Sequence, residues 1–87
     1  MINKLEVILD AYPDIEFLSA DGFDDAIIGV SNDFKLVYSS TKCFEILMKS
    51  QNLTYDDAQE YYYFNVEGAY MGENTPIFVD DELFKNK

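Results

Sequence analysis

Apolar residues recur at the spacing of a helix along the first dozen positions. Intervals of three or four positions connect the members of this set: Ile2, Leu5, Ile8, Leu9 and Tyr12. Pro13 interrupts the pattern, because a proline disfavours helical geometry in the residue before it. An amphipathic helix is therefore expected over residues 2–11.

Four short segments have the pattern or composition of strands. Residues 15–20 alternate in polarity and end at a turn signal, which predicts a strand. Residues 26–30 and 34–38 are rich in branched and aromatic side chains, and three polar residues separate them. These two segments are expected to pair as an antiparallel hairpin, and residues 76–79 predict a last strand after a proline.

Two further helices are predicted between the hairpin and the last strand. Serine and threonine residues at 39–41 are good helix caps, and the apolar positions after them predict a helix over 41–50. Thr54 is the expected cap of a helix that continues through about residue 70 toward Gly72. Residues 80–87 are expected to form a solvated, flexible tail.

This order of elements predicts one α+β domain over residues 1–87. The expected architecture is a small antiparallel or mixed sheet of three to four strands, with helices packed on one face. The apolar and aromatic content, 48% and 16%, is sufficient for a folded core.

Charge narrows the classes of partner. The chain has 17 acidic residues against six lysines and neither Arg nor His, for a net charge of −11. Such a surface repels nucleic acid and anionic membranes, whereas it attracts a protein with a basic surface. No membrane span or signal sequence is apparent, and Cys43 is the single cysteine, so a cytoplasmic location is expected.

The residue types in this sequence give little support to a catalytic function. Without His, neither a Ser-His-Asp nor a Cys-His arrangement can form, and Cys43 lies on an apolar helix face, as core residues do. Acidic doublets occur at residues 24–25, 56–57 and 80–81, but none has the ligand spacing of a calcium loop. We therefore expect no enzyme activity, no cofactor and no metal.

The predicted second long helix carries the strongest candidate binding surface. Asp56, Glu60 and Glu67 share one side of a regular helix, and Asp57 adjoins them. The partner-binding residues predicted on this helix and the following loop are Asp56, Asp57, Glu60, Glu67, Glu73 and Asn74. The alternative is that this is the ordinary solvated side of an amphipathic helix.

Four consecutive aromatic residues, Tyr61, Tyr62, Tyr63 and Phe64, occur in the same helix. Because four residues wrap a full helical turn, at least one ring must lie near the surface. Exposed aromatic rings beside carboxylates are common in binding surfaces.

Three segments, residues 22–30, 42–48 and 64–78, resemble a family of small uncharacterised bacteriophage accessory proteins. The resemblance spans about two thirds of the chain and implies no activity. It implies a context instead, an infected bacterial cytoplasm in which small acidic proteins inhibit host defence or host enzymes.

Three functions are compatible with these features. The first is a non-catalytic acidic protein that binds and inhibits or recruits a host protein with a basic surface. Mimicry of nucleic acid is one form of it, since duplex DNA carries one charge per ~1.7 Å. The alternatives are an assembly subunit that forms a homodimer or larger homo-oligomer, and a metal-dependent enzyme that uses the acidic doublets.

Overall fold

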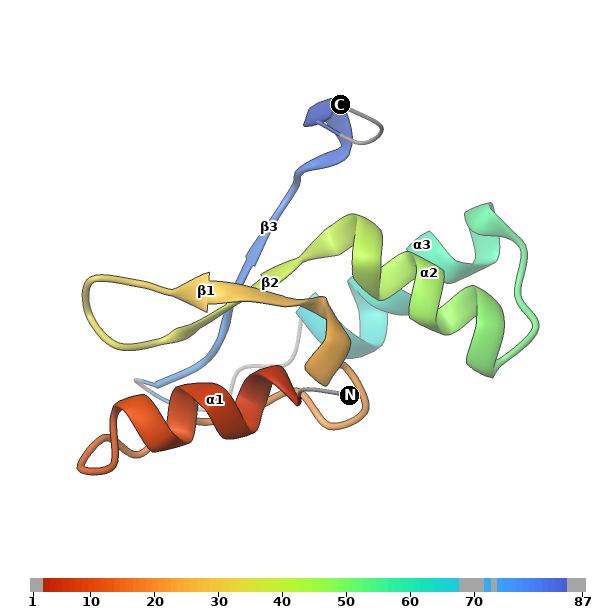
Figure 1. Ribbon diagram of the computed structural model, residues 1–87. Coiled ribbons are helices and arrows are strands. Elements are labelled where there is room, and N and C mark those ends of the chain that lie inside the picture. The colour runs from red at the N-terminus through yellow and green to blue at the C-terminus, as the bar shows by residue number, and fades with distance from the viewer. Residues whose placement is uncertain (1–2, 68–71, 73, 85–87) are drawn as a thin grey trace.

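The computed structural model describes residues 3–67, 72 and 74–84, and contains three α-helices, a π-helical turn and a three-stranded sheet in this part of the chain (Figure 1). The main elements, in chain order, are α1 (Lys4–Ala11), β1 (Ile27–Val30), β2 (Leu36–Ser39), α2 (Ser40–Ser50), α3 (Tyr55–Tyr62), the π-turn (Tyr63–Glu67) and β3 (Ile77–Val79). Short 3-10 turns at Asp24–Ala26 and Glu82–Phe84 precede β1 and follow β3.

The sheet has the order β1-β2-β3 and is mixed. The predicted hairpin is confirmed, because β1 and β2 pair antiparallel with Val30 opposite Leu36. A bulge between Ile27 and Gly29 interrupts their register. β3 pairs parallel to β2, which requires the long crossover that α2 and α3 provide. The predicted α+β class is confirmed.

Each α-helix begins at a polar side chain that accepts backbone hydrogen bonds. Asn3 Oδ1 accepts from the Leu5 and Glu6 amides at 2.9 and 3.3 Å, so α1 starts at Lys4 rather than at residue 2. Ser39 and Thr54 cap α2 and α3 in the same way, at 3.2 Å from the Lys42 and Asp57 amides. The helix starts predicted from hydroxyl residues are thus confirmed.

Aromatic rings join the helices to the sheet in the core. Phe44 of α2 meets Tyr62 of α3 edge to face, with ring centroids 5.0 Å apart, and Tyr62 meets Phe78 of β3 at 5.7 Å. Phe78 in turn stacks on Tyr38 of β2 at 5.2 Å. The buried apolar set is Phe23, Ala26, Ile27, Leu36, Tyr38, Cys43, Phe44, Leu47, Ala58, Tyr62 and Val66.

The strand predicted over residues 15–20 is wrong, since this segment is irregular. Its last amide, that of Ala20, donates to the Tyr38 hydroxyl at 2.8 Å instead of to a neighbouring strand. Residues 17–20 are all half-buried in succession, so the alternating polarity does not produce one buried and one exposed face. The segment packs on the core without joining the sheet.

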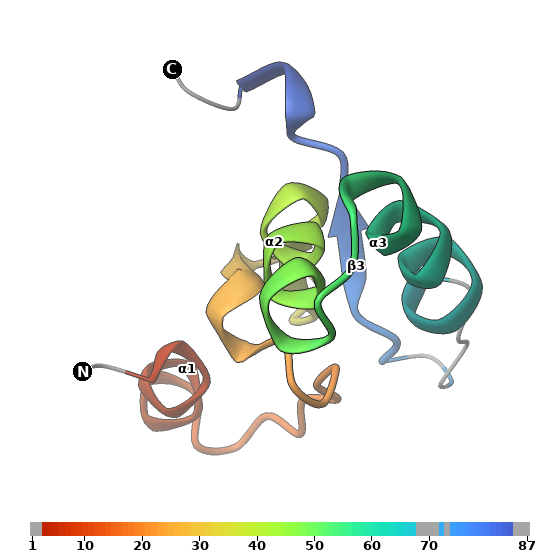
Figure 2. The same ribbon diagram turned by 90° about the vertical axis from the view of Figure 1, so that its right-hand side faces the viewer.

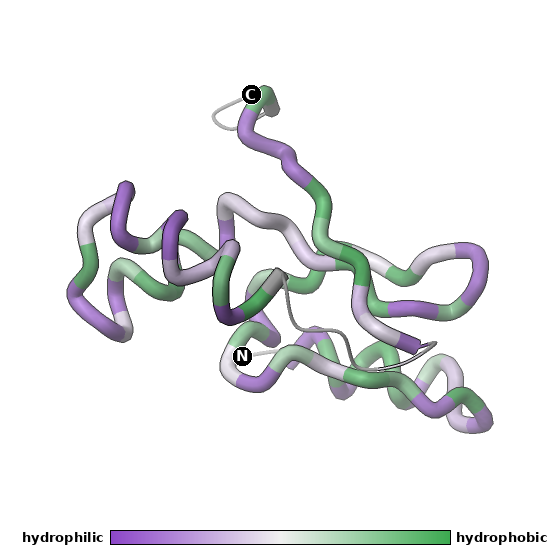
Figure 3. The backbone as a smooth tube through the Cα atoms, turned by 180° about the vertical axis from the view of Figure 1, so that it is seen from behind, coloured by the Kyte–Doolittle hydropathy of each residue, from purple (hydrophilic) through white to green (hydrophobic). Residues whose placement is uncertain are grey.

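Two residues of the tail predicted from Asp80 onward form hydrogen bonds to the rest of the molecule, and of these Asp81 is half-buried while Glu82 is exposed. Asp81 Oδ2 accepts a hydrogen bond from Ser39 Oγ at 2.6 Å, and Asp81 Oδ1 accepts from the Thr41 hydroxyl at 2.8 Å. Glu82 Oε1 accepts from the Tyr55 hydroxyl at 2.7 Å. Figure 3 shows the change from hydrophobic β3 to this hydrophilic segment. Residues 85–87 of the predicted tail lie outside the described residues.

Candidate functional site

α3 lies on the side of α2 that is remote from α1 (Figure 2), and it carries three acidic residues. Asp56, Asp57 and Glu60 are all exposed, whereas Ala58 and Tyr62 are buried. The two aspartates occupy the first turn, where carboxylates are favoured by the positive end of the helix dipole. Asp56 and Glu60, predicted to share one side of this helix, are thus both exposed.

The helix changes geometry after Tyr62. The chain continues as the π-turn of residues 63–67, in which backbone bonds join i and i+5. The predicted placement of Glu67 with Asp56 and Glu60 assumed an unbroken α-helix, and the π-turn breaks that spacing. Residues 68–71, predicted to continue the helix, lie outside the described residues.

The π-turn places aromatic rings at the surface. Tyr62 is fully buried, while Tyr63 is 50% exposed and Phe64 is 77% exposed, so the expected surface ring is found. The side-chain Nδ2 of Asn65 donates to the main-chain carbonyl oxygen of Tyr61 at 3.2 Å, where the helix changes geometry. Exposed aromatic surface is costly in water, and neighbouring exposed apolar side chains such as those of Tyr63 and Phe64 are common in contact surfaces.

A shallow hollow of about 280 Å³ lies along this surface of α3 and the π-turn. Its lining, here called the α3 hollow, consists of Leu53, Asp57, Glu60, Tyr61, Phe64 and Asn65. It combines two carboxylates with two aromatic rings and contains no lysine. Leu53, Asn65 and the individual rings were not predicted from the sequence, because no residue pattern signals a π-turn.

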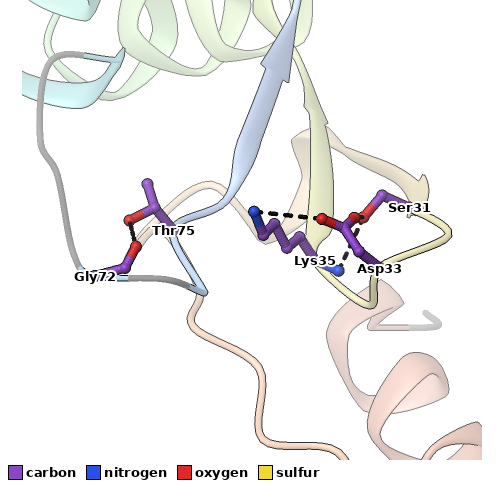
Figure 4. A network of polar contacts seen from close by, with 5 residues as sticks. All are labelled: Ser31, Asp33, Lys35, Gly72 and Thr75. Atoms are coloured by element: carbon purple, nitrogen blue, oxygen red, sulfur yellow. Dashed lines mark hydrogen bonds and ion pairs between the residues drawn. The ribbon is translucent and has the colours of Figure 1, made fainter.

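The loop before β3 is held by a local turn. The Thr75 amide donates to the Gly72 carbonyl at 3.1 Å, and the Thr75 hydroxyl contacts the same oxygen (Figure 4). Gly72 has a φ of 102°, which favours glycine. Asn74 is exposed beside it, whereas Glu73 lies outside the described residues, as does the side chain of Glu67.

A second polar network belongs to the hairpin and is structural. Lys35 Nζ lies 3.3 Å from Asp33 Oδ2, and the Lys35 amide donates to Ser31 Oγ at 3.0 Å (Figure 4). The Ser31 hydroxyl donates to Asp33, which lowers the pKa of this carboxyl. These bonds close the turn between β1 and β2, and within the described part of the chain they include the one ion pair.

The single cysteine and the acidic side chains are the candidate groups for nucleophilic and metal chemistry. Cys43 is fully buried, and burial followed by the charge of Asp81 raises the pKa of its thiol to about 12, so the reactive thiolate is disfavoured. Among residues 3–67, 72 and 74–84, no group of three Asp, Glu, Cys or His side chains is arranged to hold a metal ion.

Comparison with protein-family models gives no match, and no curated protein or solved structure matches the chain. The resemblance to bacteriophage accessory proteins therefore stays a prediction. None of the helices in the described residues has the length and apolar character needed to cross a bilayer.

Proposed function

We propose that this protein is a non-catalytic interaction protein that binds a protein partner with a basic surface at the α3 hollow. The observation that carries the proposal is Phe64, 77% exposed at a concavity that Asp57 and Glu60 border. Aromatic side chains dominate the binding energy of many interfaces, and an aromatic anchor surrounded by charge suits a partner with a basic rim.

The carboxylates of this surface are available to a partner. Asp56, Asp57 and Glu60 are exposed and form no ion pair with any described lysine. A basic partner would supply the missing counter-charges, and the field of the whole molecule would accelerate its approach. Asn74, which is exposed in the loop before β3, stays a predicted contact residue, as do Glu67 and Glu73.

The resemblance to phage accessory proteins suggests a host protein as the partner, in the cytoplasm of an infected bacterium. Binding would inhibit that protein or recruit it. A nucleic-acid-binding enzyme is one partner of this class, since its basic cleft would accept carboxylates in place of phosphates.

Exchange of charge at the hollow tests the proposal. The double variant Asp57→Lys/Glu60→Lys should lose proteins that the unmodified chain captures from a bacterial extract. Once such a protein is purified, its Kd measured by calorimetry should weaken by more than about tenfold, as expected for central interface residues. Phe64→Ala should weaken it similarly, because it removes the anchor.

The matched control is Glu6→Lys/Asp10→Lys, which makes the same change in net charge on exposed positions of α1. It should retain the partner and slow association only slightly, because charges beyond a Debye length of about 8 Å are screened at physiological salt. Equal loss in both double variants would show that net charge, and not the hollow, holds the partner.

Self-association is the rival explanation of an exposed Phe64. Light scattering coupled to size exclusion distinguishes the two, because a homo-oligomer that uses this ring would dissociate in Phe64→Ala. A monomer that retains its affinity for the purified partner supports the interaction proposal. If the protein instead forms a stable oligomer that Phe64→Ala dissociates, and if it captures no partner, self-association would replace the interaction proposal.

A further inference from the structure

A second concave surface lies between α1 and β1, far from the α3 hollow. Its charged residues are lysines, whereas those of the α3 hollow are acidic. This groove, here called the α1–β1 groove, has a volume of about 560 Å³, within the ~300–1,000 Å³ typical of small-ligand sites. Its apolar lining includes Val7, Ile8, Ile27 and Ile28, and its polar groups are Lys4 and Lys42.

The bulge in β1 exposes apolar surface to the groove. The pairing with β2 shifts between Ile27 and Gly29, so that Ile28 is the extra residue, and bulges of this kind redirect side chains. Ile28 is 48% exposed, and Val7 of α1 is 52% exposed. Two branched side chains from different elements thus remain open to solvent in one hollow, although burying them would be favourable.

Two lysines lie together beside this apolar surface in a strongly acidic protein. Burial, and next the charge of Lys42, lower the pKa of Lys4, while the Asp25 carboxylate acts in the opposite direction. Lys4 Nζ donates to the Asp25 main-chain oxygen at 3.1 Å, but neither lysine forms an ion pair with a described carboxylate. The Asp25 carboxylate therefore offsets part of their charge, but two adjacent cations that form no ion pair still attract an anion.

We propose that the α1–β1 groove binds an amphipathic carboxylate of the fatty-acid type, with its apolar chain along the groove and its carboxylate at Lys4 and Lys42. This inference is independent of the function proposed for the α3 hollow. The lysines provide charge-assisted hydrogen bonds to the head group, and the branched side chains bury the tail.

Other classes of anion fit this surface less well. An extended acidic peptide would need to add a strand to β1, but a four-residue edge strand with a bulge is a poor template for pairing. A polyanion would meet the repulsion of the net charge of −11. A small inorganic anion would leave the apolar lining exposed.

Titration with decanoate below its micelle-forming concentration, followed by ¹H–¹⁵N NMR spectra of the full chain, tests the proposal. Saturable shifts should appear in α1, in β1 and around Lys42, and not in α3. Acetate, which lacks the tail, and decanol, which lacks the charge, should bind at least about tenfold more weakly. Absence of saturable decanoate binding, or equal binding of decanol, would overturn the proposal.

A pair of substitutions on α2 tests whether Lys42 binds the carboxylate. Lys42→Gln should weaken decanoate binding by about tenfold, the effect of losing one charge-assisted hydrogen bond. Lys49→Gln removes the same charge from the last turn of the same helix, outside the groove, and should leave the affinity within about twofold. Equal weakening in both variants would assign the effect to net charge and exclude a site at Lys42.

Discussion

Phe44 and Phe64 are the same residue type in opposite environments. Phe44 is 2% exposed, and its ring contacts three tyrosines, Tyr55, Tyr62 and Tyr63, at centroid distances of 5.6, 5.0 and 6.4 Å. Phe64 is 77% exposed and has no ring partner among the described residues. One ring therefore stabilises the fold, while the other is available for binding.

Alanine substitutions should separate these two roles. Phe44→Ala is expected to lower the free energy of unfolding by about 3–5 kcal/mol, because it leaves a cavity among rings that cannot collapse into it. Phe64→Ala should change it by less than about 0.5 kcal/mol. Urea denaturation measures both, and a loss below about 1 kcal/mol for Phe44→Ala would contradict the assignment of this ring to the core.

At the scale of elements, the N-terminus of α2 joins distant parts of the chain. Ser39 ends β2 and caps α2, while Asp81, which follows β3, accepts bonds from the Ser39 and Thr41 side chains and from the Thr41 amide at 3.3 Å. Burial by itself would raise the pKa of Asp81, but these hydrogen bonds outweigh it and hold the pKa below its usual range. The bonds attach the segment after β3 to the sheet and to α2.

Asp81→Asn should therefore lower the free energy of unfolding at pH 7 by about 1 kcal/mol, the usual scale of a lost helix cap. Because the folded-state pKa of Asp81 is depressed, its stabilisation is present above the unfolded-state pKa and is lost as pH falls through the folded-state value. The variant should thus lose less stability than the unmodified chain on acidification below about pH 4.

Urea denaturation from neutral to acidic pH measures this difference. Asp10→Asn, an exposed position with no hydrogen bond from its side chain in the structure, is the control and should match the unmodified chain at pH 7. Parallel pH profiles for Asp81→Asn and the unmodified chain would show that the Asp81 carboxylate does not stabilise the fold.

At the scale of the whole molecule, charge opposes folding. The net charge is −11, yet the described residues contain one ion pair, between Lys35 and Asp33 in the hairpin turn. The acidic residues repel one another across a body with principal extents of 39, 29 and 23 Å. The Debye length shortens from ~30 Å at 0.01 M salt to ~3 Å at 1 M, so added salt weakens this repulsion.

Added NaCl should consequently raise the Tm over about 0.01 to 1 M, most steeply at the low end, where screening changes across the dimensions of the molecule. Thermal unfolding followed by circular dichroism measures the effect. A Tm independent of salt over this range would indicate that the carboxylates are locally compensated.

Local chemistry in the sequence determined the helix starts, the hairpin and the α+β class. Ser39 and Thr54 cap helices through bonds to amides three residues away, so their role depends only on nearby residues. Asn3 caps α1 just as locally, although the apolar spacing had predicted a start at residue 2. The acidic side of α3 follows likewise from the helical spacing of Asp56 and Glu60.

Tertiary structure alone decided the features that depend on distant contacts. Residues 15–20 have the pattern of a strand, but the Ala20 amide bonds to the Tyr38 hydroxyl, 18 positions away. The sequence around Asp81 is that of a solvated tail, but in the folded chain its carboxylate bonds to Thr41, 40 positions earlier, at the start of α2. The π-turn around the exposed Phe64 and the bulge at Ile28 are local departures from regular backbone geometry, and no residue pattern in the sequence predicted either of them.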